Sequence, residues 1–296
     1  MRVAFTMVEL IFVILLLGIL GVMTTDIITQ TYRNYVDQRE ISDLQTRSKQ
    51  VLNQLTDYLE DAIRPSAALF NGAAYADAWE AGVSDVNGTN YLVWIAKDSE
   101  SLRGVWSDAH GRIYPGYSGV ANVETSTQNT IRTPACDVSI IDAMQGDLVP
   151  DRPNWIDGAD YRSVIYFVYA NADGTVQERF WDWPAVSLFR ISGVTGSDTI
   201  NLADAPAQIS DRYYLSYTAK GIHAVGEALY LYDDFRPWNA QTVTAAKSYI
   251  LTENLESFEF WSESAGGLLR LKLCLNNGAG SLNGKIVFCR EAAVLR

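Results

Sequence analysis

The sequence predicts an α+β protein in which one long N-terminal α-helix packs on an antiparallel β-sheet domain. Three observations favour this class. Residues 5–23 are almost continuously apolar, and an amphipathic helical pattern follows with no proline or glycine between Val22 and Pro65. From residue 161 onward, one strand pattern follows another with no helices between them, which is typical of an antiparallel sheet.

The N-terminal helix has two parts of different character. Residues 5–23 are about as long as the helix that crosses the hydrocarbon core of a bilayer. Beyond them, mostly apolar residues recur at steps of three and four and so lie on one face of a helix. They are Ile41, Leu44, Ser48, Val51, Leu55, Leu59 and Ala62. We therefore expect one helix over residues 5–63, about 90 Å long, that ends at Pro65.

Strands are expected mainly in the second half of the chain. The apolar run 91–95 predicts a buried strand, residues 118–133 an exposed loop and residues 137–147 a short helix. Three strand pairs are predicted at 164–169 with 176–183, at 213–218 with 228–232 across a turn at 219–221, and at 258–261 with 269–273. Alternation places Leu269, Leu271 and Leu273 on one face, and residues 286–288 form the last strand.

The composition excludes several classes of function. The chain of 296 residues carries a formal charge of −12 and no cluster of basic residues, which argues against nucleic acid as the main partner. His110 and His223 are isolated, and no nucleophile motif accompanies them, so we expect no enzymatic activity. We expect no cofactor, although calcium stays open at the acidic pair Asp233 and Asp234 and at residues 151–160.

Glu9 is the unusual residue of the apolar segment. A carboxylate within a hydrocarbon layer costs about 2.5–3.5 kcal/mol, so it needs a partner and a function. An ordinary secretory signal does not account for Glu9, and residues 22–26 make a poor signal-peptidase site. A plain signal anchor accounts for the length of the segment but not for its carboxylate.

The N-terminus resembles the class III signal of type IV pilins and of the pseudopilins of type II secretion systems. The resemblance lies in a short leader that ends at Ala4 and in the sequence Phe-Thr-Met-Val-Glu-Leu that starts at Phe5. It implies cleavage between Ala4 and Phe5, N-methylation of Phe5, and an assembly role for Glu9, which offsets the amine of a neighbouring subunit. Gly18 also fits the family pattern, whereas Ala4 replaces the usual glycine before the cut.

Segments near the C-terminus extend the resemblance. Residues 229–238, 251–258, 271–274 and 288–291 look like the C-terminal half of large prepilin-like proteins of Campylobacterota, and the strand plan looks like that of J/W-type minor pseudopilins. Residues 66–160 match no family. The resemblance implies other pilin or pseudopilin subunits, a prepilin peptidase, an inner-membrane assembly platform and the lipid bilayer as partners, with the C-terminal domain in the periplasm or in a surface filament.

The three cysteines fall into a pair and a single residue. Cys274 and Cys289 lie on successive predicted strands in a compartment where disulfides persist, and many pilins close this region in the same way. A disulfide here would close a loop of about fifteen residues and contribute about 3 kcal/mol. Two unpaired thiols remain the alternative. Cys136 has no evident partner, so it is either buried and reduced or bridges to another chain.

These patterns divide the chain into a leader at 1–4, a helix at 5–64 that spans the membrane over about 5–27, a variable insertion at 65–160 and an antiparallel domain at 161–296. The expected function is structural, as a minor pilin or minor pseudopilin. A membrane-anchored or filament-tip adhesin that uses aromatic residues of 66–160 is the second hypothesis, and an anchored enzyme is the third. Asn87 lies in an Asn-Gly-Thr acceptor sequence and is expected in a surface loop.

Overall fold

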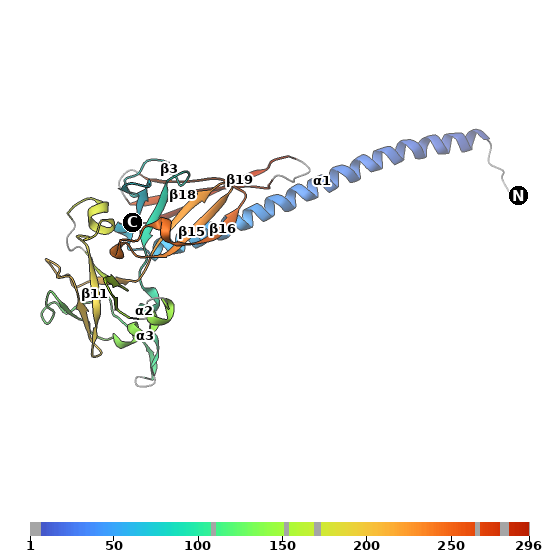
Figure 1. Cartoon of the computed structure of the whole chain (residues 1–296). Helices are drawn as coiled ribbons and strands as arrows, with labels where there is room; N and C mark the ends of the chain where they lie inside the picture. The colour runs from blue at the N-terminus through green and yellow to red at the C-terminus, as the bar shows by residue number, and fades with distance from the viewer. Residues whose placement is uncertain are drawn as a thin grey trace.

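One long helix projects from a body of β-sheets (Figure 1). The computed structural model describes residues 7–107, 111–150, 154–168, 173–263, 267–278 and 284–295. Every strand pair in these ranges is antiparallel. The predicted α+β class, with a long apolar N-terminal helix and antiparallel sheets, is therefore confirmed.

The helix α1 (Met7–Glu60) changes from exposed to buried along its length. All side chains from residue 7 to residue 35 are exposed. The second half buries Leu44, Ser48, Val51, Leu52, Leu55 and Leu59, as the periodic pattern predicted. The helix ends at Glu60, a few residues before the expected end at residue 63, because the Ile63 amide donates to the Ile95 carbonyl at 2.8 Å rather than to the helix. A 3-10 turn, η1 (Arg64–Ser66), follows.

Two sheets hold this buried half. The first has the order β16-β15-β14-β4-β1-β2, and the second has the order β19-β18-β17-β3. Their strands are β1 (Ala68–Phe70), β2 (Tyr75–Asp77), β3 (Ser84–Asp85), β4 (Tyr91–Ile95), β14 (Ala219–Val225), β15 (Ala228–Phe235), β16 (Lys247–Glu253), β17 (Leu255–Ser262), β18 (Leu268–Asn276) and β19 (Val287–Leu295). Both sheets share one hydrophobic core with α1, in which Leu55, Ile222 and Phe258 are fully buried.

The first sheet combines strands from both sides of the predicted boundary at residue 160. It takes β1, β2 and β4 from the segment 65–160 and β14, β15 and β16 from the segment 161–296. The register between β4 and β14 runs from Leu92 opposite Ile222 to Ile95 opposite Ala219. The segment 65–160 is therefore part of the β domain rather than a separate insertion, because a central strand of that domain comes from it.

A third sheet lies on the side of the body away from the free end of α1 (Figure 1). Its order is β13-β10-β11-β12-β7. The strands are β7 (Thr130–Arg132), β10 (Val164–Phe167), β11 (Leu188–Thr195), β12 (Thr199–Leu202) and β13 (Tyr213–Ser216). The helices α2 (Ser99–Arg103) and α3 (Ser139–Leu148) accompany it, and α3 confirms the short helix expected at 137–147. A separate core that includes Tyr117, Ile141 and Ile191 holds these elements together.

The remaining elements are short. Two hairpins pair β5 (Val105–Ser107) with β6 (Arg112–Tyr114) and β8 (Ile156–Asp157) with β9 (Asp160–Tyr161). Single helical turns occur at η3 (Pro237–Asn239) and η4 (Val243–Ala245).

The strand predicted at 176–183 is wrong, because a π-helical turn, η2 (Gln177–Trp181), takes its place. Thr175 and Glu178 form a reciprocal cap: Glu178 Oε2 accepts from the Thr175 amide at 2.8 Å, and Thr175 Oγ1 accepts from the Glu178 amide at 3.3 Å. Such a Thr-x-x-Glu box starts helices. The turn buries the adjacent residues Phe180 and Trp181 in one core, whereas a strand would point them to opposite faces.

The predicted pair 213–218 with 228–232 is also wrong. Strand β13 pairs with β10, and the partner of β15 is β14, which begins where a turn was predicted. Gly221 lies inside β14, where an added Cβ would meet side-chain carbons of Val93 and Val243 at 3.0 Å. Gly221 therefore allows close packing within the sheet. The turn between β14 and β15 lies further on, at Gly226, which has a φ of +60°.

The third predicted pair is confirmed as β17 and β18, although part of its turn lies outside the described residues. Leu269, Leu271 and Leu273 are fully buried. The residues between them point outward, where Arg270 pairs with Glu263 and Lys272 pairs with Glu259.

Candidate assembly helix and its supporting domain

The exposed half of α1 is the dominant apolar surface among the described residues. Its most apolar window of eighteen residues has a mean hydropathy of 2.6, and none of that window is buried. The large side chains exposed here are Met7, Val8, Leu10, Ile11, Phe12, Val13, Ile14, Leu15, Leu16, Leu17, Ile19, Leu20, Val22, Met23, Ile27 and Ile28. By length and composition, α1 is a candidate membrane span near the N-terminus.

Glu9 lies in the first turn of this helix and projects from the same apolar segment. Ala4 and Phe5, the predicted cleavage and methylation residues, lie outside the described residues. An added Cβ at Gly18 would meet nothing within 4 Å. Contacts within the described chain therefore do not require a glycine at this position.

The threonines that follow the apolar run satisfy their own hydroxyl groups. Thr24 and Thr25 donate to the carbonyls of Leu20 and Gly21 at 2.7 and 2.9 Å. Thr29 and Thr31 donate in the same way to carbonyls four residues earlier, both at 2.8 Å. Because each hydroxyl proton already has an acceptor, this stretch does not depend on water for these bonds.

The predicted disulfide is present between Cys274 on β18 and Cys289 on β19, which stand opposite each other in the register of the sheet. It therefore ties the edge strand of the second sheet to its neighbour. Strand β19 also packs against α1. Just beyond β18, the Asn277 amide donates to the Glu40 carboxylate on α1 at 2.8 Å, so this region of the domain also holds the helix.

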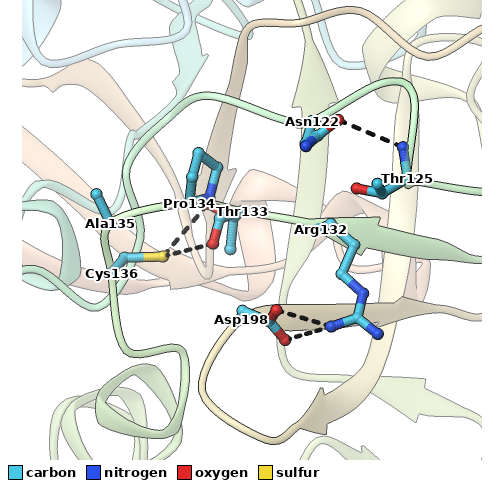
Figure 2. A pocket seen from close by; sticks show the side chains of 8 residues that line it. All are labelled: Asn122, Thr125, Arg132, Thr133, Pro134, Ala135, Cys136 and Asp198. Carbon is cyan, nitrogen blue, oxygen red and sulfur yellow. Dashed lines mark hydrogen bonds and ion pairs between the residues drawn. The ribbon is translucent and has the colours of Figure 1, made fainter.

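Cys136 is free and only 6 % exposed, and it lines a pocket of about 510 Å³ (Figure 2). Its thiol lies 3.3 Å from the Thr133 hydroxyl and 3.4 Å from the Thr133 carbonyl. Burial raises the pKa of this thiol, which disfavours the reactive thiolate. In the same pocket, one guanidinium nitrogen of Arg132, Nη1, donates to both carboxylate oxygens of Asp198, at 2.8 and 2.7 Å. The arrangement favours a buried, reduced cysteine over a bridge to another chain.

Among the other candidates from the sequence, His223 takes part in packing, and Asp233 and Asp234 form ion pairs. His223 is buried, stacks on Tyr91 with ring centroids 4.1 Å apart, and places Nδ1 2.9 Å from the Asn90 carbonyl. Asp233 pairs with Lys220, and the neighbouring Asp234 pairs with Arg236 and Lys247. Within the part of the chain that the structure describes, no group of three or more His, Cys, Asp or Glu residues could hold a metal. His110 lies outside that part, as do residues 151–153 of the acidic stretch, and Asn87 is exposed.

Sequence reasoning missed one buried polar cluster. Asp98 is fully buried at the start of α2, where its carboxylate accepts from the Ser101 amide at 2.9 Å and from Gln145 Nε2 at 2.6 Å. Gln145 in turn accepts from the Ser163 hydroxyl at 2.5 Å. Burial raises the pKa of Asp98, with smaller opposing effects from these hydrogen bonds. An Asp directly before a helical segment was the available cue, but the partner at residue 145 is distant in sequence.

Comparisons with known proteins give no relatives: no protein-family model, no curated protein and no solved structure matches the chain.

Proposed function

We propose that the chain is a structural subunit, a minor pilin or minor pseudopilin, of a type IV pilus or a type II secretion filament. The observation that supports this most strongly is the division of α1. Its first half exposes an apolar surface that carries Glu9 near its start, and its second half is built into an antiparallel domain. A subunit that leaves a membrane to join a bundle of helices needs both halves.

The proposed route has three steps. The apolar half of α1 resides in the inner membrane, with the β domain in the periplasm. A prepilin peptidase cuts between Ala4 and Phe5, and the new amine of Phe5 is methylated. Glu9 then pairs with the amine of a neighbouring subunit, which offsets its cost in an apolar environment and draws the helix into the filament. The assembly platform of the inner membrane organises this transfer.

The size of the domain favours low copy number or a position at the tip. Beyond the two sheets that hold α1, the body carries a third sheet with its own core. This extra part would crowd neighbours in a regular shaft, where each subunit is surrounded on all sides. A tip position leaves room for it.

Intact mass of the protein from native membranes tests the processing step. We expect a chain that starts at methylated Phe5, and the full chain in cells without the prepilin peptidase. A chain that still starts at Met1 in peptidase-positive cells, or one that is cut near Asp26, would contradict the proposal.

Glu9→Gln tests the assembly step. We expect the variant to stay in the membrane but to lose copurification with other filament subunits by at least tenfold. Asp57→Asn, which removes an exposed carboxylate from the same helix, is the matched control and should assemble normally. Equal copurification of the two variants would exclude a role for the Glu9 charge.

A binding module is the second candidate function, favoured by the β5–β6 hairpin. Trp106 and Ile113 stand opposite each other on it and are 64 % and 63 % exposed. An exposed aromatic–aliphatic pair of this kind is typical of recognition surfaces. Trp106→Ala in an otherwise normal filament would separate the functions, since only a binding role predicts lost adhesion with unchanged assembly.

A further inference from the structure

Charged residues become much more frequent along α1 from residue 33 onward. Between Glu9 and Arg33, Asp26 is the only charged residue, whereas five of the eleven residues from 33 to 43 are charged. The helix continues through this change without interruption. The change therefore divides one continuous helix into a nearly uncharged part and a charged part.

The length of the apolar part places that boundary. A hydrocarbon layer about 30 Å thick spans about 20 residues of helix. A span that begins between Met7 and Leu10 therefore reaches its far edge between Ile27 and Gln30. Threonines 24, 25, 29 and 31, whose hydroxyls all donate to carbonyls of the same helix, fill the approach to this edge. Polar side chains satisfied in this way are suited to the margin of a lipid layer.

Two tyrosines follow directly. Tyr32 and Tyr35 are separated by three residues, so they lie on one face of α1, and they are 61 % and 63 % exposed. They lie about 3–12 Å beyond the calculated edge, where the headgroup layer of a bilayer is about 5–8 Å thick. Tyrosine favours this layer, because its ring contacts the acyl boundary while its hydroxyl stays in polar surroundings.

The β domain contacts α1 beyond the two tyrosines, at Glu40, which accepts from Asn277 at 2.8 Å, and it leaves the tyrosines themselves exposed. The first buried residue of α1 is Leu44, about 18 Å along the helix from Tyr32. The folded domain therefore does not cover the tyrosines, and Arg33 and Arg39 beside them supply cations that suit phosphate groups.

We propose that Tyr32 and Tyr35 anchor α1 in the phospholipid headgroup layer on the side of the β domain. Because the helix is unbroken, this contact also fixes the depth of Glu9, about 34 Å from Tyr32 along the axis and close to the opposite edge of the hydrocarbon layer. The inference rests on the membrane residence proposed above for α1, but not on assembly into a filament.

Fluorescence quenching in vesicles tests this inference on the full chain. In a Cys136→Ser background that keeps the native disulfide, single cysteines at positions 28, 34 and 38 each carry a fluorophore. The vesicles contain phosphatidylethanolamine and phosphatidylglycerol, with nitroxide placed either on the headgroup or midway along the acyl chain. We expect acyl quenching to dominate at residue 28, headgroup quenching to dominate at residue 34, and quenching at residue 38 to be at least threefold weaker.

Tyr32→Ser together with Tyr35→Ser should change the ratio of headgroup to acyl quenching at residue 34 by at least threefold. Tyr249→Ser is the matched control, since it removes a tyrosine that is 53 % exposed on β16, and it should leave the ratio unchanged. An unchanged ratio in the double variant, or equal quenching at residues 34 and 38, would overturn the inference. If the protein is not cut before Phe5 but shows the expected quenching at residues 28, 34 and 38, the result would contradict the proposed pilin route and leave the tyrosine anchor in place.

Discussion

Removal of the Cys274–Cys289 disulfide should lower the free energy of unfolding of the β domain by about 3 kcal/mol. The two cysteines are fifteen residues apart in sequence. In the chain-entropy model, a disulfide that closes a loop of this length lowers the conformational entropy of the unfolded chain by about 10 cal/mol/K. This loss corresponds to about 3 kcal/mol of stability at 25 °C. Nine residue pairs join β18 and β19, so the strands should stay paired when the disulfide is absent. The loss should therefore appear in stability rather than in the fold.

The assay is denaturant unfolding of the full chain in detergent, followed by tryptophan fluorescence. The Cys274→Ser, Cys289→Ser double variant is compared with the wild-type protein, each with and without a thiol reductant. We expect the reductant to lower the midpoint of the wild-type protein to that of the double variant, and the reduced wild-type protein and the double variant to share one slope. The double variant is the control for the reductant. It should not respond to it, because the one cysteine that it retains, Cys136, is already free. A loss below about 1 kcal/mol would refute the loop-entropy reasoning.

Three further predictions use the same unfolding assay. Leu55→Ala, at a fully buried position of α1, should cost about 2–5 kcal/mol, whereas Ile41→Ala, at a position 36 % exposed, should cost less than half as much. Gly104→Ala should lower the stability more than Gly111→Ala. Both glycines have a positive φ, but only a Cβ at residue 104 would meet a backbone oxygen of β6, at 1.9 Å. Equal losses of stability in the two variants would contradict this. The pKa of Asp98 is raised in the folded state, so the folded protein holds this proton more tightly than the unfolded chain does. Protonated Asp98 therefore stabilises the fold in acid. This contribution is lost as the pH rises from near 3.8, the ordinary value, through the folded-state pKa. Asp98→Asn should therefore flatten the fall in stability with pH, and an unchanged profile would count against the raised pKa.

The sequence alone determined the division of α1. A run of apolar residues followed by a three- and four-residue stripe is a local pattern, and the helical period converts it directly into an exposed half and a buried face. The same holds for β18, where alternation placed Leu269, Leu271 and Leu273 in the core. The disulfide was also predictable, because its cysteines lie on strands that are adjacent in sequence and pair with each other.

Only the tertiary structure decided which distant strands share a sheet. The pairing of β4 with β14 joins residues more than a hundred positions apart, and no local period records such a partner. The same reason hid the contact between Asp98 and Gln145, since both are ordinary surface residue types until two helices meet. Gly221 shows the limit most clearly: glycine suggests a turn, but here its missing side chain makes room for Val93 and Val243, which only the packed sheet brings together.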